Sequence, residues 1–148
     1  MKYLIIVRHG DYDTATLGLS ASGTEKIEML TRELCLRELG RLRILTSTAK
    51  RAVESAGILS LVSNSEPEQY ALLRSDAAQD PDMPAALKLV KDRGADVDTL
   101  LIVTHQEYCD EFPSYFGKNE LQTRFQVGSI DKGQAVIIDC ATKTFERV

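Results

Sequence analysis

The feature that most constrains the fold is a set of short, almost wholly apolar runs that alternate with helical segments. Runs rich in Ile, Val and Leu, without polar alternation, are typical of strands covered by helices on both faces. The clear runs are Tyr3–Val7, Leu42–Thr46, Leu100–Thr104 and Ala135–Asp139, and a weaker one is Gln69–Leu73. Their order along the chain predicts a single three-layer α/β/α domain with a mostly parallel central sheet.

Helical periodicity fills the gaps between these runs. The first helix is predicted to begin with a capping box at Ser22 and Glu25 and to end at Gly40. Asp82 is predicted to cap a later helix, and another helix is predicted to begin near Gln106.

Length, charge and cysteine content bound the class of protein. A chain of 148 residues suits one domain over residues 1–148. A net charge of -4 disfavours nucleic-acid binding, which needs a basic surface. No stretch approaches the roughly 20 apolar residues that span a bilayer, so no membrane association is expected. The three cysteines contain no CxxC pair, which argues against a zinc site and fits a reducing cytosol.

Chemically active side chains follow several of the predicted strands. Ligands of open parallel sheets bind outside the carboxyl ends of the strands. Arg8, His9 and Gly10 follow the first run directly, and Arg51 lies one turn into the helix after the second. His105, the other of the chain's two histidines, follows the Leu100–Thr104 run. We therefore expect both histidines to converge at one crevice.

Two imidazoles and two guanidinium groups in one crevice suit phosphoryl transfer. Imidazole can act as a nucleophile near neutral pH because its ordinary pKa is about 6.5. The planar fork of an arginine matches pairs of phosphate oxygens, and fixed cations stabilise the charge of a phosphoryl group in flight. Gly10 allows a sharp turn and a close approach of the backbone to a ligand.

Aspartates also follow these strand ends. Asp11, Asp13, Asp76 or Asp80 could supply a third ligand to a metal held by the two histidines. Two arginines nearby would repel a cation, so neither a metal nor an organic cofactor is expected. Together with Asp82 these residues predict an acidic rim, which would favour a basic protein partner.

On these residues the chain resembles the histidine phosphatase superfamily, also called phosphoglycerate mutase-like. The stretch "IIVRHGD" carries the family's Arg-His-Gly, and "LSASG" at Leu19–Gly23 matches its next motif. The segment "STAKRAVESA" matches the family's arginine-bearing helix at Arg51, and "LLIVTH" matches its late Thr-His. Gln106 stands where the family commonly has glycine.

The resemblance implies a role for each of these residues. His9 would accept the phosphoryl group, and Arg8, Arg51 and His105 would bind that group and stabilise the transition state. Gly10 and Gln106 would complete the phosphate-binding set. A water would then cleave the phosphohistidine enzyme and release inorganic phosphate, with no metal and no cofactor.

The family's usual general acid is a glutamate after the third strand. Here "ALLRSDAAQD" puts Ser75 at that position and Asp76 beside it, so the acid is either Asp76 or missing. A phosphorylated imidazole is a good leaving group and needs an acid less than an ester does. Small SixA-type phosphohistidine phosphatases are similar in this respect and in size. The predicted function is therefore removal of phosphate from phosphohistidine of a protein, in the cytoplasm.

Two other functions fit the same residues. One is a small-molecule phosphomonoesterase, whose substrate would be a small phosphate ester and in which Asp76 would be a working acid. The other is a non-catalytic phosphate-binding regulatory module, which the missing acid and Gln106 favour. A receiver-type signalling domain is disfavoured, because Thr104 and His105 stand where such a domain carries a lysine.

Overall fold

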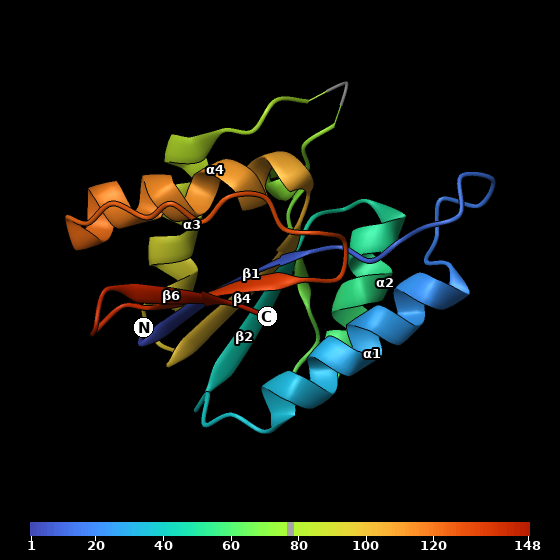
Figure 1. Ribbon diagram of the computed structural model, residues 1–148, viewed down its shortest axis with the longest axis horizontal. Helices are drawn as coiled ribbons and strands as arrows, with labels where there is room; N and C mark the ends of the chain where they lie inside the picture. The colour runs from blue at the N-terminus through green and yellow to red at the C-terminus, as the bar shows by residue number, and fades with distance from the viewer. Residues whose placement is uncertain (77–78) are drawn as a thin grey trace.

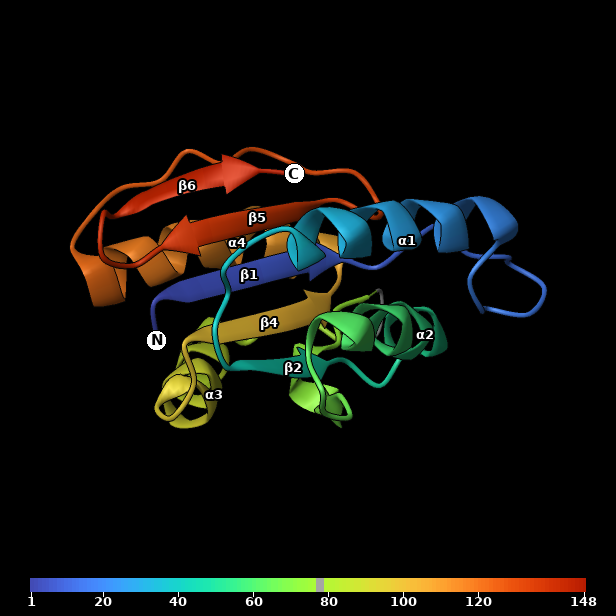
Figure 2. The same cartoon turned by 90° about the horizontal axis from the view of Figure 1, so that it is seen from below.

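A six-stranded sheet forms the centre of the part of the chain that the structure, a computed structural model, describes: residues 1–76 and 79–148 (Figure 1). The strand order is β3-β2-β4-β1-β5-β6, and Figure 2 shows most of these strands side by side. The four strands from β3 to β1 run parallel, while β5 and β6 are antiparallel to their neighbours. The prediction of a mostly parallel sheet is confirmed. The strands are β1 (Tyr3–Arg8), β2 (Leu42–Thr46), β3 (Glu68–Gln69), β4 (Thr99–Thr104), β5 (Ala135–Asp139) and β6 (Thr144–Arg147).

Helices cover both faces of the sheet, which gives the predicted three layers. Helices α1 and α2 lie on one side and α3 and α4 on the other (Figure 1). No helix in the described ranges is long and apolar enough to cross a membrane. The helices are α1 (Ala21–Cys35), α2 (Lys50–Leu59), α3 (Met83–Gly94) and α4 (Gln106–Phe116), with short 3₁₀ segments η1 (Ser60–Val62) and η2 (Ala71–Leu73) and a π-helical turn η3 (Gly117–Leu121).

The central strands are apolar on both faces because each face has its own hydrophobic core. Successive side chains of a strand point to opposite faces. In β1, Leu4 and Ile6 pack with the helix pair α3 and α4, whereas Ile5 and Val7 pack with α1 and α2. All four side chains are at most 1% exposed. This double burial explains the lack of polar alternation in the apolar runs.

Three local predictions about helix ends have different outcomes. The cap of α1 is Ser20, whose Oγ accepts a hydrogen bond from Gly23 N at 3.0 Å, so the predicted capping box at Ser22 was wrong. Helix α1 ends at Cys35, and Gly40 instead lies in the turn before β2 with a φ of +65°. The predicted Asp82 cap of α3 is confirmed by its bond from Ala85 N at 3.1 Å.

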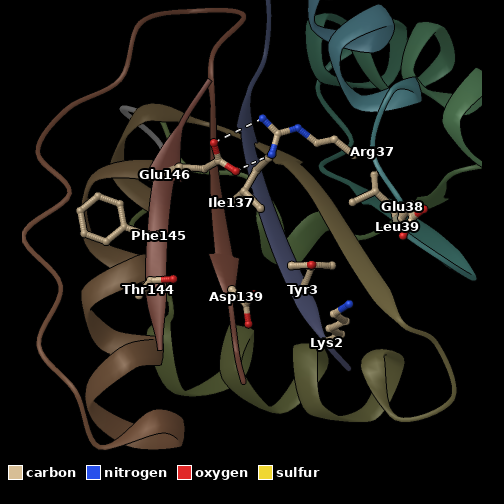
Figure 3. A pocket seen from close by; sticks show the side chains of 10 residues that line it. All are labelled: Lys2, Tyr3, Arg37, Glu38, Leu39, Ile137, Asp139, Thr144, Phe145 and Glu146. Carbon is tan, nitrogen blue, oxygen red and sulfur yellow. Dashed lines mark hydrogen bonds and ion pairs between the residues drawn. The ribbon is translucent and has the colours of Figure 1, made fainter. Parts of the chain in front are cut away.

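Two edge elements depart from the sequence prediction. The weak strand predicted over Gln69–Leu73 is reduced to β3, and its second half forms η2, which is apolar because Leu73 packs into the core. Strand β6 was missed because most of its side chains are exposed and its pattern is polar. It is tied to the rest of the fold by Arg37, which hydrogen-bonds Glu146 of β6 (Figure 3).

Candidate active site

The two histidines lie together at the carboxyl edge of the parallel strands. Strands β1 and β4 pair in register up to Arg8 and Thr104, and His9 N donates to Thr104 O at 3.1 Å. The next residue along β4 is His105, and the ring centroids of the two histidines are 5.1 Å apart. The two histidines therefore converge at this edge of the sheet, as expected.

The ring of His9 is held with one nitrogen directed at Arg51. His9 is 4% exposed, and its Nδ1 lies 2.9 Å from the backbone oxygen of Gly10, a contact in which Nδ1–H donates. The lone pair is then on Nε2, which accepts a hydrogen bond from Arg51 Nε at 3.2 Å. A neutral imidazole in this tautomer has a nucleophilic nitrogen facing a guanidinium group.

Arg51 also reaches the second histidine. Its Nη2 lies 3.3 Å from His105 Nδ1, and the other nitrogen of that ring, Nε2, lies 2.8 Å from Ser47 Oγ. With Arg51 as the donor, His105 Nε2–H donates to the serine hydroxyl. One guanidinium group thus bridges two imidazoles.

Burial and nearby positive charge keep both imidazoles neutral at pH 7. Burial lowers the pKa of His9 to about 4, helped by the charges of Arg51, Arg8 and Lys132 and opposed by the hydrogen bond to Gly10. Burial likewise lowers the pKa of His105 to about 3, helped by His9 and Arg51. A neutral His9 has an unprotonated Nε2, whose lone pair attacks phosphorus once Arg51 Nε donates to a phosphoryl oxygen instead.

These pKa values lead to a direct NMR prediction. The chain has only two histidines, so two imidazole signals can be followed in a pH titration. Because a lowered pKa favours the neutral ring, neither signal should move between pH 8 and pH 5.5, and His9 should begin to take up its proton only as the pH approaches about 4. His9→Asn assigns the signals by removing one of them. A midpoint near the ordinary value of about 6.5 for either ring would contradict the prediction.

Arg8 presents a buried donor toward the same crevice. Its Nη1 donates to Ile130 O at 3.0 Å and its Nη2 to Gln106 Oε1 at 3.2 Å. A third nitrogen, Nε, is buried and has no acceptor among residues 1–76 and 79–148. A buried donor without an acceptor is costly, so this atom suits an anionic oxygen. Gln106 therefore orients Arg8 from the first turn of α4.

Because Gly10 has no side chain, the segment after β1 can lie close to both α1 and α2. A Cβ atom at this position would lie 2.9 Å from the backbone oxygen of Gly23 and 3.0 Å from Leu19 Cδ2. Gly10 N donates to Ser55 Oγ at 3.0 Å, and that hydroxyl donates to Arg51 O at 2.7 Å. The loop that carries His9 is thereby fixed to the helix that carries Arg51.

The expected acid, Asp76, is already engaged by a neighbouring cation. Arg74 Nε donates to Asp76 Oδ2 at 2.8 Å, and the charge of Asp76 raises the pKa of His105. Asp76 thus lies within electrostatic reach of the site. Residues 77 and 78, which follow Asp76, lie outside the described residues.

Ser75, at the position of the family's acid, is anchored to α4. It is 2% exposed, and its Oγ donates to Glu107 Oε2 at 2.8 Å. This contact fixes the backbone next to Asp76 against the helix that follows His105.

Sequence reasoning missed two residues at the mouth of the site, Tyr12 and Lys132. The Tyr12 ring has Arg51 Cζ 4.8 Å and Lys132 Nζ 5.2 Å from its centroid. Its edge-on contact with the His9 ring measures 5.6 Å between centroids. Lys132 was missed because β5 is antiparallel, so the residues before it, and not those after it, reach this edge. The turn-like "DKGQ" before Ala135 is the signal that could have identified it.

Two of the five aspartates of the expected acidic rim, Asp11 and Asp76, are paired with cations. Asp11 forms an ion pair with Lys26 at 2.9 Å, and this hydrogen bond lowers the pKa of Asp11. Asp76 is paired with Arg74, and Asp13 Oδ1 accepts a hydrogen bond from Ala15 N at 2.7 Å. Within residues 1–76 and 79–148, no group of three or more His, Cys, Asp and Glu side chains is arranged to hold a metal ion.

A separate hollow of about 560 Å³ lies at the amino end of β1 (Figure 3). Tyr3 and Ile137 line it together with the Arg37–Glu146 pair, and no histidine is among its lining residues in the described part of the chain. Tyr3 stands at the start of β1 and His9 just after its end, so the strand separates them by about 20 Å. The candidate site is therefore the pair of histidines at the carboxyl end of β1, and not this hollow.

Comparison with known proteins gives structural matches only. No family model matches the chain, and no curated protein matches it in sequence. The structure of mycobacterial glucosyl-3-phosphoglycerate phosphatase Rv2419c in complex with VO3 is 15% identical, covers 100% of this chain and 98% of that one, and has a TM-score of 0.75. The protein histidine phosphatase SixA complexed with tungstate is 18% identical, with coverages of 99% and 96% and a TM-score of 0.71.

A third match is the product of the open reading frame Rv3214 from Mycobacterium tuberculosis, at 14% identity, coverages of 99% and 95% and a TM-score of 0.72. These matches run over nearly the full length of both chains, so they include every strand and helix that carries the candidate site. The chain therefore has the fold of the histidine phosphatases, at the size of SixA.

Proposed function

We propose that this protein is a phosphatase that forms a phosphohistidine intermediate on His9 and removes phosphate from phosphohistidine of a protein. The observation that carries the proposal is the neutral His9 ring, whose Nε2 faces Arg51 beside a second neutral imidazole. The likeness in fold to SixA and Rv2419c, both complexed with phosphate-like oxyanions, supports it.

In the first step, the lone pair on His9 Nε2 attacks phosphorus. A bond forms between phosphorus and His9 while the bond from phosphorus to the substrate's imidazole breaks, and that imidazole takes up a proton from water. Arg8 Nε and the Arg51 donors bind the phosphoryl oxygens, with His105 beside them. The backbone at Gly10 and the side chain of Gln106 hold these groups in place.

In the second step, water attacks the phosphorus of the phosphorylated enzyme. The bond to His9 breaks, and inorganic phosphate and the free imidazole are released. Positioned cations and a nucleophile are sufficient for both steps, so we propose that the reaction is independent of metal ions.

The leaving group favours phosphohistidine over an ester. Ser75 stands where the family usually has its acid, and the carboxylate of Asp76 is paired with Arg74. An alkoxide departs poorly without a general acid, whereas an imidazole departs readily. The second candidate, a small-molecule phosphomonoesterase, is supported by the electrostatic effect of Asp76 on His105 and by the likeness in fold to a glucosyl-3-phosphoglycerate phosphatase.

The test compares both substrate types with a metal chelator present throughout. Wild type should dephosphorylate a phosphohistidine protein rapidly and an aryl phosphate slowly, and His9→Ala should abolish both activities. Rapid ester cleavage would favour the phosphomonoesterase. Loss of activity in the chelator would contradict metal independence. Tight vanadate binding without turnover would favour the non-catalytic phosphate-binding module.

Asp76→Asn separates the two catalytic candidates. Under the proposed function, this change should alter phosphohistidine hydrolysis by less than about 3-fold, because the departing imidazole needs little acid assistance. Residual ester hydrolysis should fall by about 10-fold or more, because Asp76 is the carboxyl group whose charge acts on His105 and an ester needs a general acid. Steady-state kcat and KM on both substrates provide the measurement. A large loss on phosphohistidine alone would contradict this assignment.

We also propose a cytoplasmic location. All three cysteines are free, and Cys35 is exposed. An exposed free thiol suits a reducing compartment. The partner would be a phosphorylated protein in the same compartment.

A further inference from the structure

Lys132 lies beside Tyr12, close to the site, and its charge acts on both His9 and Asp11. Two other cations near the site form ion pairs, Lys26 with Asp11 and Arg74 with Asp76. Lys132 Nζ instead lies 5.2 Å from the centroid of the Tyr12 ring, and it forms no ion pair within residues 1–76 and 79–148. The side chain is only half-buried, so its ammonium group is available to a ligand.

The backbone around Lys132 is fixed against the nucleophile. Gly133 N donates to both Arg8 O at 3.0 Å and His9 O at 3.2 Å. Gly133 has a φ of +81°, a conformation that favours glycine, and Asp131 N donates to Gln134 Oε1 at 2.8 Å to close the turn. Lys132 is therefore held by the same hydrogen bonds that fix the end of β1.

The ammonium group lies one aromatic ring away from the nucleophile. Tyr12 contacts His9 on one side and Lys132 on another. The charge of Lys132 lowers the pKa of His9, which confirms that the two groups are near each other. The phosphoryl oxygens already have Arg8 and Arg51. Lys132, a third cation at this distance, is suited to bind a negative charge on the leaving group of the substrate.

The surface beyond Lys132 has room for that part of the substrate. A groove of about 590 Å³ begins at Lys132 and Gly133 and runs over α1. Met29, which is 59% exposed, and Leu30 form part of its wall.

The geometry points to a leaving-group subsite in which Lys132 binds a carboxylate close to the phosphorylated atom of the substrate. This inference rests on the proposed function, because it assigns a departing group to the reaction at His9. The carboxylate would be an acidic residue next to phosphohistidine in a protein, or a carboxylate of a small phosphate ester. Either would form a charge-assisted hydrogen bond with the ammonium group.

The test uses pairs of substrates in which one member carries the carboxylate and the other lacks it. One pair consists of phosphohistidine peptides with Glu or Gln next to the histidine, and the other of 4-carboxyphenyl phosphate and phenyl phosphate. Wild type should have a kcat/KM about 10-fold higher for the carboxylate member of a pair, which corresponds to one charge-assisted contact. Lys132→Met should remove this preference while it changes kcat/KM for the neutral member by less than about 2-fold.

The control variant is Lys88→Met, which removes an exposed lysine on α3, on the other face of the sheet. It should retain the preference in full. If only the peptide pair shows the carboxylate preference, the substrate is a protein. If only the aryl phosphate pair shows it, the substrate is a small ester. Equal losses on both members of a pair in Lys132→Met, or no preference in wild type, would overturn the subsite.

Binding to the His9→Ala variant separates this inference from the proposed function. Calorimetry with 4-carboxyphenyl phosphate and phenyl phosphate needs no turnover. If wild type hydrolyses nothing, the proposed function fails, while a carboxylate preference in binding that Lys132→Met abolishes would still establish the subsite. Equal binding of the two compounds would overturn it.

Discussion

Replacing Arg51 by methionine should lower kcat/KM by about 10³-fold, because one guanidinium group is bonded to both imidazoles of the site. Its Nε donates to His9 Nε2 and its Nη2 lies against His105 Nδ1. Removal of a single preorganised donor commonly costs about 10² to 10³ in rate, and here several donors are lost together. The fold should survive, since Arg51 is only half-buried and its charge has no carboxylate partner within residues 1–76 and 79–148.

Arg51→Lys tests whether activity depends on the planar guanidinium group of Arg51 or only on its positive charge. Lysine keeps the positive charge but cannot donate to two rings in one plane, so a loss of about 10²-fold is still expected. Arg41→Met is the matched control, because the Arg41 side chain is 70% exposed and remote from the site, and its kcat/KM should stay within about 2-fold of wild type. Full activity of Arg51→Lys would mean that Arg51 acts only as a point charge.

An NMR titration of the methionine variant supplies an independent readout. The charge of Arg51 lowers the pKa of both His9 and His105, so its removal should raise both values. A merely unfolded variant would instead give two imidazoles with the ordinary pKa of about 6.5. Unchanged titration curves together with unchanged kcat/KM would contradict the bridging role of Arg51.

The position of the site could be predicted because it depends on strands that are unambiguous in sequence. The runs that became β1 and β4 are apolar since both faces are buried, and this pattern has few alternatives. Once two such strands are parallel and adjacent, the residues that follow them must meet at one edge. Arg8, His9 and His105 are therefore brought together by topology, with no need to know any side-chain contact in advance.

Other features depend on direction and on contacts that no short pattern contains. Lys132 reaches the site only because β5 is antiparallel to β1. The sequence of an apolar run does not indicate whether its strand is parallel or antiparallel to its neighbour. Ser20 and Ser22 are equally good caps in sequence, and only the packing of α1 selects Ser20. The acid could not be assigned because Ser75 and Asp76 each have partners from their surroundings, Glu107 for one and Arg74 for the other.

Gly23→Ala should destabilise the protein by roughly 2–4 kcal/mol and lower its activity, although Gly23 lies outside the crevice. A Cβ atom there would lie 2.0 Å from the backbone oxygen of Asp11 and 2.8 Å from its backbone nitrogen. Backbone cannot rotate away as a side chain can, so α1 and the segment after His9 must separate. Gly10, whose own Cβ position is 2.9 Å from Gly23 O, would move with that segment.

The close approach of α1 to Asp11 explains the residues of the "LSASG" stretch. Ser20 caps α1, Gly23 lets the helix lie against Asp11, and Leu19 packs beside Gly10. Gly57→Ala is the matched control, because Gly57 lies within α2 and no atom lies within 4 Å of its Cβ position. That change should stabilise the protein by about 0.5–1 kcal/mol through helix propensity. Urea unfolding of both variants measures the difference, and opposite signs are expected. If Gly23→Ala were as stable as Gly57→Ala, the contact with Asp11 would not hold the His9 loop in place, and the hydrogen bonds of the loop to Ser55, Thr104 and Gly133 would position it.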